Sequence, residues 1–392
     1  MRRKSGRAAW FTIVIAAAVA VAVFAPSLKV AYLATLLLLE LPTPETDGPI
    51  SGRLADPQVT RVTFEAAGRT MVADVYRPAS GPHDSRHPGI VLNHGVAAGG
   101  MNDLRLINFA DALARAGYVA LVPEFINLKE FRVRPSDVGE VVGSYEYLER
   151  LHDVDAERIG LFGFSYAGGI ALLAANDPRI AERVRFCFML GSYYDLKSIV
   201  TYATTGYYKE NGEWVYMEPR HTGKWAFLRN SLELVEDGAD RRLLRHIANS
   251  KLEDDTCDVS AAADSLGEEG AKLYELMANE DPAAAAGIID GLSPRVLEYF
   301  DALSLPGNIE NVTAHLIIAH GRDDNLMPYT ESLILAENAP PGATVQLRIL
   351  ESFQHVDLEF SWEGGPAGWV ATLAEIGRVY SVAHALLAQG LL

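Results

Sequence analysis

The sequence predicts an α/β protein built on a mostly parallel sheet. From residue 59 onward, short runs rich in β-branched residues alternate with stretches of helical periodicity, a pattern typical of parallel strands covered by helices on both faces. The 392 residues, 49% hydrophobic and 22% charged, suffice for a full core. The 33 glycines and 19 prolines follow no fixed period, which excludes a collagen-like or disordered chain.

The chain begins with a basic and then strongly hydrophobic segment. Four basic residues up to Arg7 precede residues 8–28, which carry no charge. As a helix this stretch is about 31 Å long, enough to cross the hydrocarbon core of a membrane. The basic residues favour a cytoplasmic amino terminus, which places the rest of the chain on the extracytoplasmic side.

A cleaved signal peptide is the alternative for this segment, because Ala20-Val21-Ala22 offers a small-residue cleavage site. A second apolar run, residues 30–39, is too short to span a membrane alone but suits an anchor or membrane-associated helix. We therefore expect a basic and hydrophobic membrane segment over residues 1–41. Residues 42–58, rich in Pro, Gly, Asp and Thr, are expected to form a linker.

The remaining chain, residues 59–392, is expected to be one α/β domain. Its first elements are an antiparallel hairpin at 59–64 and 70–76, strands at 89–93, 119–123, 159–164 and 184–190, and helices at 103–116, 136–151 and 166–175. After a long interval, strands at 314–319 and 345–350 and helices at 329–337 and 367–387 finish the chain.

The interval of about 192–311 predicts an inserted, largely helical cap. Six of the 16 tyrosines fall within residues 193–216, where they either line a substrate pocket or form the core of the cap. Residues 231–281 carry 14 acids against five bases. These acids indicate a solvated face and no metal site, because no histidine-bearing ligand spacing accompanies them.

The strongest chemical signal is the run Gly-Phe-Ser-Tyr-Ala-Gly-Gly at residues 163–169, set between an expected strand and an expected helix. A nucleophile on such a sharp turn has a strained backbone, so its neighbours two positions away must be small. Ser165 would stand clear of the sheet at a helix amino terminus, whose partial positive charge favours a developing anion. The pattern therefore indicates that Ser165 is a catalytic nucleophile.

With this motif the chain resembles the α/β-hydrolase superfamily over nearly all of residues 59–392 outside the cap. It looks most like the serine esterase, dienelactone-hydrolase-like and prolyl-oligopeptidase-like branches. Ala167 stands where the usual turn has glycine. Because alanine is still small, this departure is compatible with the superfamily and leaves undecided only which of its branches the chain resembles most. Dienelactone hydrolases proper use a cysteine nucleophile, so Ser165 argues against that specific activity.

The resemblance also implies the other two members of a catalytic triad. Residues 321–328, Gly-Arg-Asp-Asp-Asn-Leu-Met-Pro, resemble the family's GxxDxxVP turn, whose fourth position, here Asp324, is the triad acid; Asp323 is the competitor. His355, in a loop after the last strand, resembles the catalytic histidine. His355 would take the proton of Ser165 and pass it to the leaving group, while Asp324 fixes its tautomer.

An oxyanion hole is normally formed by the amide after the nucleophile and one from the loop after the third strand. The resemblance implies the backbone amides of Tyr166 and Val96 for these roles. The matching family histidine organises the loop, so His94 is expected to do the same and not to act as the base.

These observations predict a serine hydrolase that cleaves a small-molecule or lipid-like carboxylic ester through an acyl-enzyme, without cofactor or metal. Thioesterase, acyltransferase and peptidase activities use the same triad and stay open. An inactive membrane-tethered binding module is the alternative from another class. The net charge of −17 excludes nucleic acid as a partner, and two cysteines, Cys187 and Cys257, provide no disulfide framework.

Overall fold

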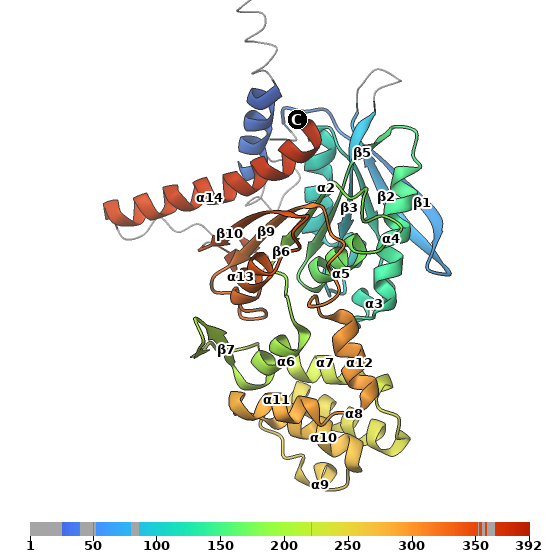
Figure 1. Cartoon of the computed structure of the whole chain (residues 1–392), viewed down its shortest axis with the longest axis vertical. Helices are drawn as coiled ribbons and strands as arrows, with labels where there is room; N and C mark the ends of the chain where they lie inside the picture. Colours follow the sequence, from blue (N-terminus) through green and yellow to red (C-terminus); the bar gives the residue numbers. More distant parts are fainter. Residues whose placement is uncertain are drawn as a thin grey trace, which may run out of the picture.

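A computed structural model describes residues 26–39, 50, 52–79, 86–220, 222–351, 353–354, 357–358 and 365–392. The chain forms a sheet-containing body with a helical cap at one end, and the helix of residues 26–39 lies at the opposite end (Figure 1).

The body is organised around an eight-stranded sheet in the order β1-β2-β4-β3-β5-β6-β9-β10. Strand β2 runs antiparallel to both of its neighbours, and all other adjacent pairs are parallel. The predicted α/β class with a mostly parallel sheet is confirmed. The strands are β1 (Gln58–Ala66), β2 (Arg69–Arg77), β3 (His87–Asn93), β4 (Val119–Pro123), β5 (Val154–Phe164), β6 (Phe186–Leu190), β9 (His315–Gly321) and β10 (Thr344–Leu350).

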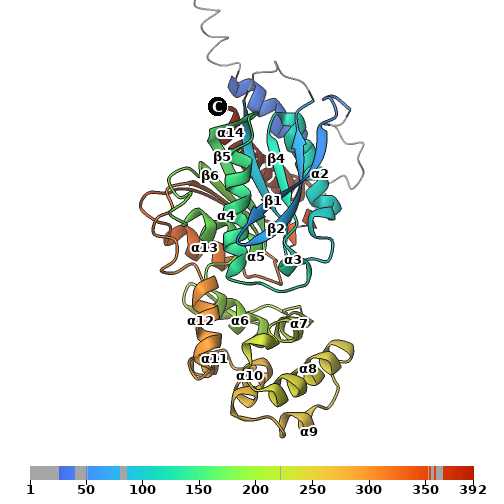
Figure 2. The same cartoon turned by 90° about the vertical axis from the view of Figure 1, so that its right-hand side faces the viewer.

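Helices cover both faces of this sheet, as Figure 2 shows. The central strands are therefore apolar on both sides: Leu161 belongs to the core cluster of one face, whereas Phe162 belongs to that of the other. The body helices are η1 (Gly100–Asn102), α2 (Leu104–Ala116), α3 (Ile126–Lys129), α4 (Ser136–Glu149), α5 (Tyr166–Ala175), α13 (Thr330–Glu337) and α14 (Gly365–Leu391).

Local sequence signals fix the ends of these helices. At the start of α2, the Asp103 carboxylate accepts a hydrogen bond from the Arg105 amide, which satisfies a donor that the helix itself cannot pair. The helix ends at Gly117, whose φ of 115° is far more accessible to glycine than to other residues. A sharp stop here lets the chain turn directly into β4.

The cap is inserted between β6 and β9. It contains α6 (Leu196–Thr205), α7 (Thr222–Asn230), η2 (Leu232–Leu234), α8 (Gly238–Glu253), α9 (Ser260–Ala263), α10 (Glu268–Ala278), α11 (Pro282–Asp290) and α12 (Pro294–Leu303). A β-hairpin that the sequence patterns did not predict, β7 (Tyr207–Glu210) and β8 (Glu213–Tyr216), turns through Asn211 and Gly212, both at positive φ.

The apolar run of residues 30–39 is folded against the body. In the helix of residues 26–39, Val30, Leu33 and Leu37 are buried in the same core cluster as Leu386 and Leu387 of α14. Most of the predicted membrane-spanning stretch, residues 8–28, lies outside the described residues. Among the helices within the described ranges, none is both long and apolar enough to cross a membrane.

Both cysteines are free thiols, and Cys187 is buried in β6. Burial raises the pKa of the Cys187 thiol to about 12, so it stays protonated and packs as a small apolar side chain.

Candidate active site

The predicted site residues that the structure describes lie in turns at one edge of the sheet. Strands β3, β5, β6 and β9 are parallel neighbours, so their carboxyl ends meet at the same edge. The chain enters the cap from the carboxyl end of β6, and the cap lies beyond this edge of the sheet (Figure 1). Gly95, Ser165 and Asp324 follow the ends of β3, β5 and β9 respectively.

Ser165 occupies a strained turn between β5 and α5. Its backbone has φ 55° and ψ −131°, a conformation that costs a non-glycine residue on the order of 1–3 kcal/mol. Two backbone hydrogen bonds hold the turn: the Ser165 amide donates to the Leu190 carbonyl over 2.9 Å, and the Gly168 amide donates to the Ser165 carbonyl over 2.9 Å. The hydroxyl of Ser165 makes no hydrogen bond that caps α5, so it is not consumed by the helix end.

Small residues around Ser165 are required by close packing. A Cβ added at Gly163 would overlap the carbonyl group of Ala167. One added at Gly168 would lie 2.7 Å from the Ser192 hydroxyl oxygen. The strained serine, the compact strand-to-helix turn and the mostly parallel sheet together define the fold.

The chain has the α/β-hydrolase fold.

In this α/β-hydrolase fold, the loop after β3 lies beside the turn that carries Ser165. A Cβ added at Gly95 would come within 3.7 Å of the Ser165 Cβ. Among the residues that the structure describes, neither a carbonyl nor a side chain accepts a hydrogen bond from the amides of Val96 or Tyr166. Two unused backbone donors thus flank the turn that carries Ser165.

His94 is buried and holds the loop after β3 in place. The Phe125 amide donates to its Nε2 over 3.0 Å. Since an amide can only donate, Nε2 carries no proton, and Nδ1–H donates to the Gly95 carbonyl over 2.8 Å. Burial lowers the pKa of His94, which keeps the ring neutral. Both ring nitrogens are engaged with backbone, which is the organising arrangement that the sequence analysis expected for His94.

The two neighbouring aspartates of the β9 turn lie in different environments. Asp324 is buried, and its Oδ1 accepts hydrogen bonds from the amides of Leu326 at 2.9 Å and Met327 at 3.0 Å. Asp323 is exposed to solvent. Hydrogen bonds from two amides favour an ionised carboxylate at Asp324.

His320 contacts the turn that carries Asp324 and helps to hold it in place, a role that the sequence patterns did not predict. Its Nε2 lies 2.9 Å from the Met327 carbonyl and 3.3 Å from Oδ2 of Asp324, and its Nδ1 lies 2.7 Å from the Ser332 hydroxyl. The histidine is fully buried. The one available signal was its place at the end of a buried strand, directly before the aspartate turn.

The third predicted triad member, His355, lies outside the described residues. It directly follows β11 (Phe353–Gln354), which pairs antiparallel with β12 (Asp357–Leu358). The structure thus brings Ser165 close to the loop after β3 at one sheet edge, and Asp324 follows the end of β9 on that edge. The contacts of His355 lie outside the described residues.

Cap tyrosines lie over this edge. The Tyr202 side chain of α6 is buried, and its hydroxyl has no hydrogen-bond partner among the described residues. Burial raises the pKa of the Tyr202 phenol, and the nearby charge of Asp324 raises it further. Tyr193 differs, because its hydroxyl donates to the Leu303 carbonyl over 2.7 Å and so belongs to the packed cap base.

Glu331 of α13 attaches the cap to the body. One carboxylate oxygen accepts from the amides of Tyr194 at 2.9 Å and Asp195 at 3.0 Å, and the other accepts from the Ser198 hydroxyl. Burial raises the pKa of this carboxyl group. Sequence analysis did not find Glu331, since an acid in the first turn of a helix is normally a surface residue.

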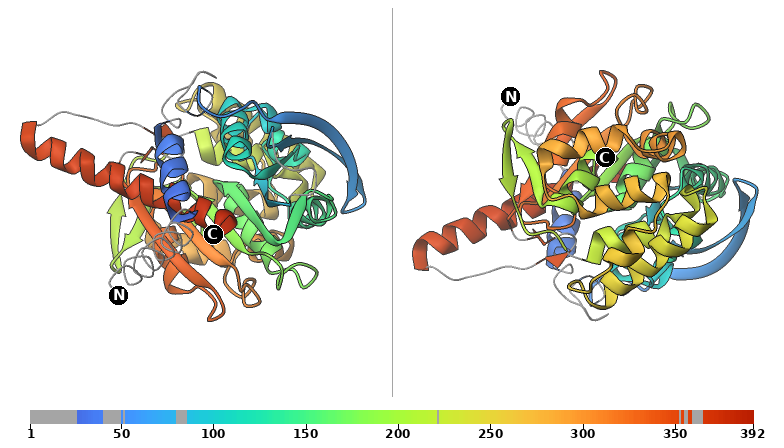
Figure 3. Two further views of the ribbon diagram at one scale, coloured as in Figure 1. Left: turned by 90° about the horizontal axis from the view of Figure 1, so that it is seen from above. Right: turned by 90° about the horizontal axis from the view of Figure 1, so that it is seen from below.

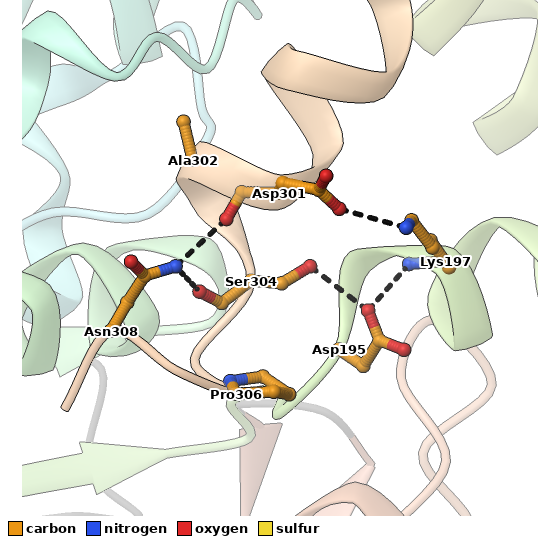
Figure 4. A pocket seen from close by; sticks show the side chains of 7 residues that line it. All are labelled: Asp195, Lys197, Asp301, Ala302, Ser304, Pro306 and Asn308. Atoms are coloured by element: carbon orange, nitrogen blue, oxygen red, sulfur yellow. Dashed lines mark hydrogen bonds and ion pairs between the residues drawn. The ribbon is translucent and has the colours of Figure 1, made fainter. Parts of the chain in front are cut away.

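A pocket of about 360 Å³ opens beside this attachment (Figure 4). Within it, Lys197 forms an ion pair with Asp301 over 2.7 Å, and the Ser304 hydroxyl donates to Asp195 over 2.9 Å. The Asn308 side-chain amide donates to the backbone carbonyls of Asp301 and Ser304, so each polar side chain that lines the pocket already has a partner. It is lined by Asp195, Lys197, Asp301, Ala302, Ser304, Pro306 and Asn308, none of them a predicted site residue.

Comparisons with known proteins give distant likenesses. No protein-family model matches the chain. An uncharacterised 31.7 kDa protein of the traX-finO intergenic region of Escherichia coli is 29% identical over 102 residues, which is 24% of this chain and 35% of that protein.

Solved structures that resemble the chain are α/β-hydrolases of several activities. A 2,6-dihydroxy-pseudo-oxynicotine hydrolase is 16% identical with a TM-score of 0.46, over 84% of this chain and 69% of that one. An acylaminoacyl peptidase from Pyrococcus horikoshii is 15% identical with a TM-score of 0.47, over 84% and 42%. A dienelactone hydrolase from Anabaena variabilis is 12% identical with a TM-score of 0.42, over 83% and 97%. At such low similarity these proteins carry no argument about activity.

Proposed function

We propose that the chain is a serine hydrolase that cleaves a carboxylic ester through an acyl-enzyme on Ser165. The observation that carries this proposal is the strained backbone of Ser165, held between β5 and α5 beside two unused amide donors. Strain of this kind persists where the surrounding structure enforces it, and it is concentrated at functional sites.

In the proposed reaction, Oγ of Ser165 attacks the ester carbonyl carbon while its proton passes to His355. The carbonyl oxygen becomes an oxyanion, which the amides of Val96 and Tyr166 stabilise. When the tetrahedral intermediate collapses, the bond to the alcohol breaks and His355 returns the proton to it. Water then attacks the acyl-enzyme by the same route, releasing the acid and restoring Ser165.

Asp324 is proposed to orient His355 and to stabilise the imidazolium that forms. Its burial and its two amide hydrogen bonds, at 2.9 and 3.0 Å, keep the carboxylate in one position. The side chain of Asp323 is exposed, and no hydrogen bond holds it among the described residues. This contrast supports Asp324 for the role.

We further propose that the protein is held at a membrane by residues 8–28, with the hydrolase on the extracytoplasmic side. Support comes from the sequence, in which four basic residues precede an uncharged stretch of spanning length. A signal peptide cleaved near residue 22 is the competing account. Protease treatment of intact cells, followed by fractionation, distinguishes them: the anchor leaves the protein in the membrane fraction and open to protease, whereas cleavage releases a soluble form.

The activity is tested with the purified full chain in detergent. A chain-length series of p-nitrophenyl esters, a matching series of acyl-thioesters and a set of peptide amides are compared by kcat/KM, with Ser165→Ala as the blank. The proposal expects esters to be the preferred class. Preference for thioesters or amides would correct the substrate class, and no turnover above the Ser165→Ala blank would favour a binding module.

A further inference from the structure

The helix of residues 26–39 has two apolar faces. One face is buried against the body, as described above. The other presents Leu28, which is 68% exposed, Tyr32 at 50% and Leu39 at 52%. These three residues are four and seven positions apart, so they lie along one side of the helix. The exposed residues of this helix also include Ser27, Lys29 and Thr35, and no element among the described residues covers the three apolar side chains.

A second exposed apolar face lies on α14. Its first turns carry Trp369, Val370 and Leu373, each more than half exposed and within about 100° of one another around the helix. Figures 1 and 3 show this part of α14 projecting beyond the sheet, while the rest of the helix crosses the same end of the body that carries residues 26–39.

This end is opposite the candidate active site. Near the end of α14, the Leu386 carbonyl accepts a hydrogen bond from Tyr118, which directly precedes β4. The Gly390 carbonyl accepts from Arg158, and a Cβ at Gly390 would lie 2.7 Å from Pro88 of β3. Contacts with the starts of strands place α14 at the amino edge of the sheet, whereas Ser165 lies at the carboxyl edge.

We propose that these two helices rest on a lipid bilayer and hold the catalytic edge away from it, so that the substrate is a water-soluble ester. The proposal builds on the membrane location above. The chain that precedes the helix of residues 26–39 indicates that a bilayer covers these faces. The uncharged stretch of residues 8–28 ends inside this helix, at Leu28. If that stretch enters the membrane, it brings the outer face of the helix to the membrane surface. Tyrosine and tryptophan are the residues enriched at that interface.

The packing also makes the attachment rigid. The predicted linker of residues 42–58 follows the helix of residues 26–39, and that helix is itself part of the core through Val30, Leu33 and Leu37. No free spacer therefore separates residue 28 from the body. The helix of residues 26–39 and α14 both lie at the end of the molecule opposite the cap (Figures 1 and 2).

Depth-dependent quenching tests this arrangement on the full chain in vesicles of phosphatidylcholine and phosphatidylglycerol. In a Cys257→Ser background, a nitrobenzoxadiazole label is attached through Tyr32→Cys, Leu373→Cys or, as the cap control, Ser260→Cys. All three positions are exposed, so labelling leaves the core intact. Nitroxide groups on lipid acyl chains should quench the labels at 32 and 373 severalfold more than the label at 260.

Each other result overturns a defined part of the account. Vesicle-bound protein with all labels unquenched would disprove docking while leaving the anchor in place. Preferential quenching at 260 would reverse the orientation. Protein that fails to float with vesicles would disprove the membrane location itself. In the same samples, hydrolysis of vesicle phospholipid but not of p-nitrophenyl acetate would disprove a water-soluble substrate. If neither compound were hydrolysed, the proposed esterase activity would be the part that is wrong.

Discussion

The Phe125 amide donates to Nε2 of His94 over 3.0 Å, and this hydrogen bond fixes both the tautomer and the protonation state of the histidine. A second proton on the ring would have to occupy Nε2 and would expel the amide. The loop that carries the Val96 amide is therefore coupled to the neutral form of a buried imidazole.

This coupling predicts a pH dependence of stability. Because burial lowers the pKa of His94 below its ordinary 6.5, the unfolded chain binds more protons here than the folded chain does once the pH falls below about 6.5. The His94 contribution to stability is thus present above that pH and is lost as the pH falls toward the folded pKa. Urea unfolding between pH 7.5 and 5 should show this loss.

A variant series isolates the contribution of His94. His94→Ala should cost about 1–3 kcal/mol at pH 7.5, since it leaves the buried Phe125 amide without an acceptor. It should also flatten the decline between pH 7.5 and 5. The exposed His152→Gln serves as the control and should leave both quantities unchanged. An undiminished decline in His94→Ala would show that other groups cause it.

The two aspartates of the β9 turn should differ sharply in kinetics. We expect Asp324→Asn to lower kcat on the order of 10⁴-fold, the loss known for the corresponding change in a serine protease, because the wrong histidine tautomer is then favoured. Asp323→Asn removes an exposed carboxylate and should change kcat less than about tenfold. Steady-state rates on one p-nitrophenyl ester check this, and the reverse ranking would show that the acid is Asp323.

The turn that carries Ser165 should not tolerate a side chain at Gly163. Gly163→Ala places a methyl group against the Ala167 carbonyl, so we expect a loss of about 1–3 kcal/mol from overpacking. Gly287→Ala is the matched control. It lies in α11 with open space around its Cβ position and should gain about 0.5–1 kcal/mol. Equal effects in thermal unfolding would mean that the turn is looser than described.

The buried tyrosines of the cap offer a test of whether they serve substrate or packing. Tyr202→Phe removes a hydroxyl that has no hydrogen-bond partner among the described residues and should not lower stability, whereas Tyr193→Phe breaks a 2.7 Å hydrogen bond and should cost about 1 kcal/mol. Kinetics then decide the role: we expect Tyr202→Phe to lower kcat/KM, which would place the hydroxyl in the substrate pocket. Unchanged kinetics would assign it to the cap core.

Sequence patterns predicted the centre of the sheet well because central strands such as β4 and β6 are continuous buried apolar runs. The strand at 119–123 and the helix at 166–175 have the predicted bounds. The hairpin β7–β8 was missed although Asn211-Gly212 is a strong turn signal, since the flanking tyrosines were considered only as pocket or core residues.

Residues that act through tertiary contacts could not be predicted in the same way. Glu331 and His320 contact groups brought near by folding: backbone amides from the start of the cap in the first case, and the carbonyl of Met327 in the second. Nothing in their neighbouring sequence marks them. Similarly, residues 30–39 have the composition of a membrane helix, and only the body's complementary apolar surface shows that one face is buried in the protein.

Covalent labelling tests the assignment of Ser165 most directly. The full chain is treated with a fluorophosphonate, digested and analysed by tandem mass spectrometry, beside Ser165→Ala and the heat-unfolded chain. We predict one phosphonylated residue, Ser165, in the folded protein and no adduct in either control. An adduct on another residue that persists in Ser165→Ala, or no adduct on folded protein that hydrolyses esters, would contradict the account.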